Sequence, residues 1–536
     1  MRPSAPSPDA AAQPPRAPDA KPSLRHLLTE TERFVTAVEI VTSRGMITER
    51  RSQRVLGLAR ELAASPRIDV LSITDNPAGD AMLSADTLGT DLIGRGQEVI
   101  IHLACKDWNR NALQSRAWKL ASEGFHNVLA LSGDVPVRGY KGAAAPVFDI
   151  DSVGLLRMYS DMNEGTVIHG REGDVVDRTA FFLGAVVTNH KRQENEVMPQ
   201  LFKLRKKVEH GARFVINQIG YNARKDHELI RWVGQEGLDI ALLANVFVLS
   251  RASARVFHAG RVPGVTVSAE LLEAVERAAA GPDGGHAFFL DLAARQVAIA
   301  RGLGFRGAYL GGHLEAEDYE RVLDAAAAYE PDWPALAREL QYDLPDEWYL
   351  YERDAETGLA APELNRAYAA SLAKRRRGRG APLSYRVSRK VHDAVFAEDA
   401  PLAPAARRFY ERAERAPRPV GRVLHLVEQA AKVPMFECRD CGDCSLPDIA
   451  YLCPESQCAK NQRNGPCGGT REGGMCEVGD KPCIWARAYD RLKPYGEEAT
   501  MLDGPAVIKD NALAHTSAWA NTLLGRDHHA GGGPGA

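Results

Sequence analysis

The sequence contains no run of about 18 consecutive apolar residues, the length that a membrane-spanning helix requires. It also has little net charge, because 67 Lys and Arg residues oppose 70 Asp and Glu residues and leave −3. So small a charge creates no overall field to attract nucleic acid or an anionic membrane. The start of the chain lacks the apolar stretch of a secretory signal. We therefore expect a cytoplasmic protein without nucleic-acid or membrane partners.

Cysteine is nearly absent outside one segment. Eight of the nine cysteines lie between Cys438 and Cys483, and the ninth is Cys105. A disulfide framework is a poor explanation without a secretory signal, and it would spread its cysteines over a whole domain. This density of thiols indicates metal binding.

The 536 residues are enough for more than one domain. Residues 1–24 are rich in Pro and Ala and residues 528–536 are mostly Gly, so we expect disordered tails at both ends. A mitochondrial transit peptide is the alternative for the start, but that segment has few arginines. Between the tails we expect a barrel over 33–330, a linker over 331–383 and a cysteine-rich domain over 384–527.

Alternating secondary structure is predicted between residues 33 and 330. Apolar, β-branched runs alternate there with amphipathic patterns, as in a parallel sheet with crossover helices. Eight such units fit a (β/α)8 TIM barrel better than a doubly wound sheet, since no G-x-G-x-x-G follows an early strand. The expected strands are Val35–Thr42, Asp69–Asp75, Glu98–Cys105, Asn127–Asp134, Phe181–Thr188, Ala212–Ile219, Asp239–Ser250 and Gly307–His313. The expected helices include Glu49–Ala64, Arg110–Glu123, Arg192–His210, Asp226–Glu236 and Phe288–Gly302.

The segment after the barrel is irregular, with several prolines and a basic run, Lys374–Arg379. We interpret it as a solvated linker. A nucleic-acid patch is the alternative, but aromatic residues are not interleaved with the basic ones. A helical pattern over Ser384–Val423 leads into the cysteines. The C-terminal domain is therefore predicted to be mainly helical and metal-binding.

Polar residues end several expected strands, at the face where such barrels place their chemistry. Each has a structural explanation when taken alone: an ion-paired carboxylate for Glu39, a turn for Asp134 and a core imidazole for His102. Their convergence on one mouth favours a functional site. The residues at these strand ends are Glu39, Thr74, His102, Asp134, Asn189 or His190, and Gln218.

Five motifs recur in one order and spacing: Val-Glu39-Ile, Ser-Ile-Thr74, Ile-His102-Leu-Ala-Cys, Ala-Leu-Ser-Gly-Asp134-Val-Pro and the stretch from Leu204 to Gln218. Together they resemble the methylenetetrahydrofolate reductase family over about residues 33–330. The resemblance implies a flavin barrel that reduces 5,10-methylenetetrahydrofolate to 5-methyltetrahydrofolate in one-carbon and methionine metabolism. The alternatives are oxidation of methyltetrahydrofolate at the same site and a non-catalytic scaffold with a zinc module.

The resemblance also implies roles for two carboxyl groups. Glu39 matches the general acid that protonates the departing nitrogen when the folate's five-membered ring opens, a task that needs a raised pKa. Asp134 matches an aspartate near the flavin and pterin, where its charge tunes the flavin.

Four further residues match ligand contacts of the family. Thr74 and His102 match positions beside the flavin, and Lys207 matches a lysine at its phosphate and ribityl region. Gln218 matches a folate-contacting glutamine. The resemblance implies FAD, with FMN as the alternative, NAD(P)H or ferredoxin as electron donor, a folate as the small-molecule substrate, and a homo-oligomer.

The sequence departs from the family pattern at three strand ends. Ser132 stands where arginine is common, and Tyr309-Leu-Gly-Gly-His313 lacks the arginine that usually holds the folate's glutamate tail. Val187-Thr188-Asn189-His190 replaces the usual Tyr-Pro-Glu-X-His. We expect the flavin and folate-tail contacts to differ accordingly.

The cysteine spacing suits two four-cysteine metal centres. A C-x2-C-x2-C loop presents three thiolates to a cubane cluster, whereas zinc sites built from four cysteines also use C-x2-C. No histidine lies within the segment, so its eight cysteines allow two zinc sites or two [4Fe–4S] clusters, and the spacing favours iron–sulfur. The predicted ligands are Cys438, Cys441, Cys444, Cys453, Cys458, Cys467, Cys476 and Cys483.

Several motifs of this region are similar to a C-terminal domain that some of these reductases carry. They are Cys438-Arg-Asp-Cys-Gly-Asp-Cys-Ser-Leu-Pro, Tyr-Leu-Cys453-Pro, Arg-Asn-Gly-Pro-Cys467-Gly-Gly and Cys483-Ile-Trp. The resemblance implies an electron-transfer or metal-binding partner of the flavin barrel. We hypothesise that it relays single electrons from an electron-donor protein such as ferredoxin.

Overall fold

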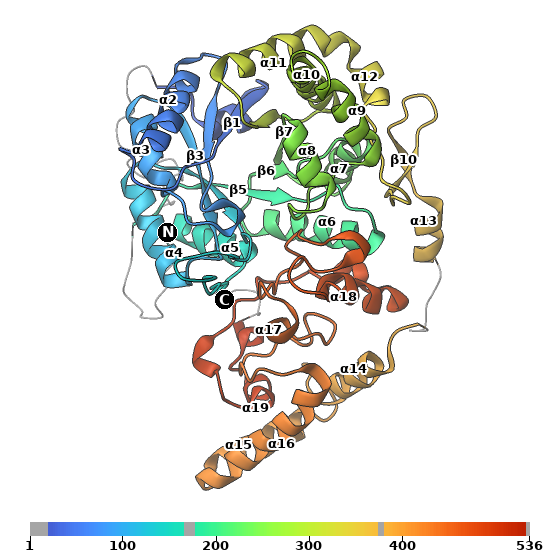
Figure 1. Cartoon of the computed structure of the whole chain (residues 1–536). Helices are drawn as coiled ribbons and strands as arrows, with labels where there is room; N and C mark the ends of the chain where they lie inside the picture. The colour runs from blue at the N-terminus through green and yellow to red at the C-terminus, as the bar shows by residue number, and fades with distance from the viewer. Residues whose placement is uncertain (1–19, 166–176, 374–379, 532–536) are drawn as a thin grey trace, which may run out of the picture.

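The computed structural model describes residues 20–165, 177–373 and 380–531 (Figure 1). Eight strands form a closed barrel in chain order, and β1 pairs in parallel with both β2 and β8. The predicted TIM barrel with a cysteine-rich helical C-terminal region is therefore confirmed. Every strand lies inside its predicted range: β1 (Val35–Ile40), β2 (Val70–Ile73), β3 (Glu98–Ala104), β4 (Asn127–Leu131), β5 (Phe182–Val187), β6 (Phe214–Asn217), β7 (Ala241–Phe247) and β8 (Gly307–Gly311).

Helices surround the barrel and cover the outward side chains of its strands (Figure 1). Outward residues such as Val38 and Leu71 pack with these helices into one large apolar core. The covering helices are α2 (Arg50–Ala64), α3 (Ala85–Gly94), α4 (Arg110–Ser122), α5 (Ser152–Glu164), α6 (Glu194–Glu209), α7 (Ala223–Gln235), α8 (Arg251–His258), α9 (Ala269–Ala279), α10 (His286–Leu303) and α11 (Ala316–Tyr329).

The barrel interior is a second core, to which every other strand residue contributes. Val35 and Ala37 belong to it, so the two-residue period carries Glu39 inward at the C-terminal end of β1. At the opposite end, α1 (Leu24–Thr29) packs its leucines into this core, and its first amide donates to Glu98 at the start of β3. A ligand therefore meets the inward polar residues from the C-terminal mouth.

The segment predicted as a linker forms structured elements instead. Helix α12 (Trp333–Glu339) is followed by an antiparallel hairpin, β9 (Tyr351–Arg353) with β10 (Ala360–Leu364), and by α13 (Arg366–Ala373). The hairpin contacts α7, where Arg224 donates to the Tyr351 carbonyl at 2.9 Å. Sequence patterns did not reveal this because the partners come from a distant helix. The basic run Lys374–Arg379 lies outside the described residues.

The C-terminal region begins with three helices, α14 (Leu383–Val395), α15 (Ala403–Arg415) and α16 (Arg418–Phe436). The helical pattern expected over Ser384–Val423 is thus broken twice and continues further along the chain. Helices α15 and α16 lie side by side and extend away from the barrel (Figure 1). The cysteine-rich loops follow, with α17 (Pro454–Gln457), α18 (Ile484–Leu492) and α19 (Ala518–Leu523).

Both expected tails are ordered where the structure describes them. Residues 1–19 and 532–536 lie outside the described part of the chain. Lys21 Nζ donates to the Ser65 carbonyl at 2.8 Å, and the 3-10 turn η8 (His528–Gly531) bonds to Asp448. Composition did not predict this order because the partners are far away in sequence. No helix in the described ranges is long and apolar enough to cross a membrane.

Candidate active site

Four hydrogen-bonded side chains occupy the C-terminal end of the barrel interior. Tyr309 Oη of β8 donates to Glu39 Oε2 of β1 at 2.8 Å and lies 3.3 Å from His102 Nε2 of β3. The same His102 nitrogen lies 2.8 Å from Ser72 Oγ of β2. Strands β1 and β8 are the first and last of the barrel, so closure of the sheet brings these groups together.

Burial sets the protonation of this group. It raises the pKa of Glu39, and the Tyr309 hydrogen bond opposes part of that rise because it stabilises the carboxylate. Burial also lowers the pKa of His102 to about 4, so the imidazole is neutral at pH 7. Glu39 keeps partial exposure at the mouth. The Glu39 carboxyl therefore keeps its proton to a higher pH than an exposed glutamate would, and it can deliver that proton at the mouth.

Asp134 is held by the cysteine-rich region rather than by the Glu39 network. It follows β4, and 46% of its side chain is exposed. Lys460 Nζ lies 3.6 Å from Asp134 Oδ1 and also pairs with Glu477. Nearby, Ser132 Oγ donates to Gln462 Oε1 at 2.9 Å. The β4 end of the mouth is thus shaped by residues more than 300 positions later in the chain.

The other three predicted barrel residues bond to the main chain around the same mouth. Thr74 donates its amide to a carbonyl of β1 at 3.1 Å, and Gln218 Oε1 accepts from the next amide at 2.9 Å. Lys207 Nζ reaches from α6 to a carbonyl of β5 at 2.6 Å. Burial lowers the pKa of Lys207 to about 7. The structure thus joins Glu39 and His102 in one network and places the others around it.

Two buried polar atoms at the strand ends have no hydrogen-bond partner among the described residues. They are Thr42 Oγ1, just after β1, and Asn189 Oδ1, just after β5. Buried polar atoms are costly unless a ligand or water satisfies them. Together with the buried amine of Lys207 at β5, these two atoms supply donors and acceptors of the kinds that the ring edge and phosphate of a flavin require.

A cavity opens beside the mouth, between the end of β5, the loop before α9 and the later cysteine-rich loops. Its charged lining is mixed, with Lys191, Arg192 and Arg471 on the basic side and Glu196, Glu472 and Asp480 on the acidic side, and Arg192 pairs with Glu472. Val262 and Val265 contribute apolar lining, so the cavity suits a ligand with both apolar and polar parts.

The eight cysteines separate into two groups by the charges that they exert on one another. Burial raises the pKa of Cys438 and Cys444, and the charge of Cys453 raises both further. Burial likewise raises the pKa of Cys458 to about 11, and the charge of Cys467 adds to the rise. The first cysteine group comprises Cys438, Cys441, Cys444 and Cys453, and the second cysteine group comprises Cys458, Cys467, Cys476 and Cys483.

Each cysteine group offers four thiolates, which is the ligand number of a tetrahedral zinc site and of a [4Fe–4S] cluster. The donor set fits either kind of metal centre.

The second cysteine group lies against the barrel mouth. Lys191 Nζ donates to the Thr470 carbonyl at 3.0 Å, and Lys203 Nζ donates to the Gly465 carbonyl at 3.0 Å. Helix α18 packs along α6 (Figure 1). A Cβ on Gly468 would overlap the Thr188 hydroxyl, so the backbone approaches the end of β5 closely.

Three functional candidates did not emerge from the sequence. Ser72 and Tyr309 occupy inward positions of β2 and β8. The two-residue period of these strands would have identified them if it had been applied to the residues that precede the strand ends. Lys460 lies two residues after Cys458. Nothing in its local sequence indicates a partner in the barrel.

Two family profiles match the chain. That of methylenetetrahydrofolate reductase covers residues 28–302, just over half of the sequence, and that of the methylenetetrahydrofolate reductase C-terminal region covers residues 419–511. The chain belongs to the methylenetetrahydrofolate reductase family. Its members are folate-acting oxidoreductases that generally depend on flavin. The fused arrangement expected from the motifs is thereby confirmed.

Solved structures with detectable similarity include the following two proteins. An uncharacterized protein from Clostridium thermocellum that binds two copies of 5-methyl-5,6,7,8-tetrahydrofolic acid is 10% identical, with a TM-score of 0.40 over 57% of this chain and 98% of that one. A 2,3-dimethylmalate lyase of the PEP mutase/isocitrate lyase superfamily is 15% identical, with a TM-score of 0.30 over 61% of this chain and 88% of that one. No curated protein matches the chain.

Proposed function

We propose that this member of the reductase family reduces 5,10-methylenetetrahydrofolate to 5-methyltetrahydrofolate, with Glu39 as the general acid. The observation that carries the proposal is the network of Glu39, Tyr309 and His102, which keeps a carboxyl of raised pKa at the mouth of the barrel.

Glu39 supplies the proton that ring opening requires. Hydride can add to the one-carbon unit only after the five-membered ring has opened to an iminium, and the departing nitrogen must be protonated for that. The raised pKa keeps the carboxyl protonated at a higher pH than an exposed glutamate would be. Tyr309 fixes Oε2 and so orients the carboxyl toward the folate.

A flavin, taken to be FAD, would supply the hydride when bound. Thr74 and His102 would line its ring, and Lys207 would meet its phosphate. Asp134 and Gln218 would hold the pterin. Lys191 and Arg471, in the lining of the cavity beside the mouth, would receive the glutamate tail in place of the arginine that the end of β8 lacks.

The two cysteine groups would carry iron–sulfur clusters that relay electrons to the barrel. The C-x2-C-x2-C spacing supports this assignment, and zinc is the alternative. The position of the second cysteine group at the mouth, and the reach of Lys460 to Asp134, support an order in which the first group receives electrons and the second passes them on. A one-electron donor such as ferredoxin suits this order, and NAD(P)H is the alternative donor.

Glu39→Gln tests the acid assignment because it keeps the size of the side chain and removes the proton. We expect folate turnover to fall about 100- to 10,000-fold while the donor still reduces the flavin at the wild-type rate. Anaerobic stopped-flow absorbance measures flavin reduction, and a steady-state assay measures turnover. Glu61→Gln, on the exposed face of α2, is the matched control and should change neither rate. Equal loss of both rates in Glu39→Gln would sink the assignment.

The pH profile gives a second test. Because the pKa of Glu39 lies above its usual 4.5, turnover should fall as pH rises through that raised value. Tyr309→Phe removes the hydrogen bond that holds this pKa down, so the alkaline limb should move to higher pH. An unmoved limb would contradict the role of Tyr309.

A further inference from the structure

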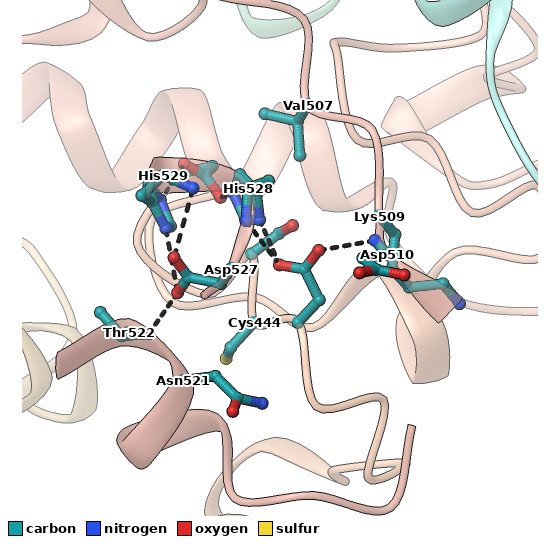
Figure 2. Close-up of polar contacts among 12 residues, drawn as sticks. Cys444, Val507, Lys509, Asp510, Asn521, Thr522, Asp527, His528 and His529 are labelled. Atoms are coloured by element: carbon teal, nitrogen blue, oxygen red, sulfur yellow. Dashed lines mark hydrogen bonds and ion pairs between the residues drawn. The ribbon is translucent and has the colours of Figure 1, made fainter. Parts of the chain in front are cut away.

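Three side chains of the C-terminal region converge beside the loop of the first cysteine group. His528 Nε2 and His529 Nε2 each lie 3.1 Å from an oxygen of Asp448, one on Oδ2 and the other on Oδ1. Across the described residues, these three form the one set of His, Cys, Asp or Glu ligand atoms lying within 4.8 Å of one another. The two imidazole rings lie side by side, with centroids 3.9 Å apart (Figure 2).

A second carboxylate orients each imidazole from behind. His528 Nδ1 bonds to Asp443 Oδ1, and His529 Nδ1 lies 3.4 Å from Asp527 Oδ2 (Figure 2). Asp527 is fixed in turn by Thr522, whose hydroxyl donates to it at 2.5 Å. A histidine that binds a metal through one ring nitrogen commonly bonds to a carboxylate through the other. The carboxylate fixes the ring and directs the metal-binding nitrogen to the ion.

We propose that Asp448, His528 and His529 bind a zinc(II) ion, at a site separate from both cysteine groups. Two imidazole nitrogens and one carboxylate oxygen are ligands that zinc accepts at about 2.0–2.2 Å. Ligand atoms at such lengths around a tetrahedral ion lie about 3.4 Å apart. Here each imidazole nitrogen lies 3.1 Å from its nearer Asp448 oxygen, and one ligand atom of each residue lies within 4.8 Å of the others. The side chain of His529 is 38% exposed, so water can enter and occupy the fourth position.

The position of the site indicates what the ion does. Asp448 follows the C-x2-C-x2-C loop, and Asp443 lies inside that loop, between Cys441 and Cys444. The histidines belong to turn η8, more than 75 positions later. A metal ion here would tie this turn to the loop of the first cysteine group and stabilise that loop. Binding would also displace protons from the imidazoles.

Zinc stoichiometry of the whole protein, purified with its clusters and supplied with zinc sulfate alone, tests the proposal. We expect one zinc per chain in the wild type and none in His529→Ala or Asp448→Asn, with iron and sulfide unchanged in both. His515→Ala is the matched control, because that exposed imidazole also pairs with an aspartate but belongs to no such set. Equal zinc in the wild type and His529→Ala would overturn the site.

A measurement on the unaltered protein guards against variants that fail to fold. Cobalt(II) exchanged for the zinc should give ligand-field bands without thiolate-to-cobalt charge transfer, and X-ray absorption at the zinc edge should show nitrogen and oxygen neighbours. Sulfur neighbours would place the zinc on the cysteines and refute the proposal, as would the absence of bound zinc.

Discussion

Each of the two cysteine groups lies beside a buried lysine–glutamate ion pair, but the two ion pairs have different neighbours. In the first group, Lys432 Nζ lies 3.0 Å from Glu428 and 3.6 Å from Cys444 Sγ, with both charged side chains buried. Glu428 also accepts from Ser517 at 2.6 Å. All these partners belong to the C-terminal region, so the charge of the first group is balanced locally.

In the second group, the lysine of the corresponding ion pair also contacts the barrel. Lys460 pairs with Glu477, whose carboxylate lies 3.6 Å from Cys467 Sγ, and both charged side chains are buried. Lys460 Nζ also lies 3.6 Å from Asp134 at the end of β4. The charge of the second group is therefore shared with the candidate active site.

The comparison shows that a buried lysine–glutamate pair can balance the charge of a cysteine group locally or connect such a group to the barrel. Burial alone would lower the pKa of both lysines, but the neighbouring thiols and carboxylates raise each of them, so both remain charged. A cation beside a thiolate cluster stabilises its negative charge. Of the two lysines, Lys460 is the one that contacts the barrel, through Asp134.

The largest expected effect is on turnover, and it tests which of the two cysteine groups receives electrons first. Cys441→Ser and Cys476→Ser should each abolish turnover driven by ferredoxin, because the two centres act in series. After mixing with reduced ferredoxin, the Cys476→Ser protein should show a reduced first centre, whereas the Cys441→Ser protein should show neither centre reduced. Electron paramagnetic resonance distinguishes these states. Reduction of the second centre in Cys441→Ser at the wild-type rate would reverse the proposed order.

Removing the lysines compares the two ion pairs directly. Lys432→Met and Lys460→Met should each lower the free energy of unfolding by about 3–5 kcal/mol, because each leaves a buried carboxylate unpaired. Denaturant unfolding measures this. Only Lys460→Met should also slow folate reduction, through Asp134. Similar folate kinetics in the two variants would break the distinction between the groups.

Two glycines in the loops of the second cysteine group allow the side that faces the barrel to be compared with the side that faces away from it. Gly468 and Gly473 both have positive φ, and an alanine at either should cost about 1–2 kcal/mol in backbone strain. Gly468→Ala adds an overlap with Thr188, worth about 1–3 kcal/mol more, and should weaken folate binding. Thermal unfolding and the folate KM measure both effects. Equal losses of stability in the two variants would mean that the loop at Gly468 does not contact the barrel mouth closely.

The smallest effect concerns Lys207, on which the charge of Cys467 acts from the second group. With a pKa of about 7, Lys207 loses its charge as pH rises above neutrality, so flavin affinity should decline over that range. Lys207→Met should lower the affinity about tenfold at pH 6 and flatten its pH dependence. Fluorescence titration of flavin-free protein measures both. An unchanged slope would remove Lys207 from the phosphate site.

Periodicity accounts for how much of the barrel could be predicted. Buried parallel strands read as apolar β-branched runs, and the two-residue period places Glu39, Thr74, His102 and Gln218 on inward positions near the same end. The Tyr309 hydrogen bond to Glu39 could not be read in this way. It exists because the eighth strand closes on the first, which no local pattern encodes.

The sequence by itself determined the strand and helix alternation, the inward polar residues and the eight thiols, because these depend on short-range periodicity and side-chain chemistry. Tertiary structure decided that the second cysteine group lies against the mouth, that Lys460 meets Asp134, and that His528 and His529 meet Asp448. Each of these contacts joins residues tens to hundreds of positions apart. Their proximity follows from barrel closure and the docking of the C-terminal region, so it appears only once the whole chain has folded.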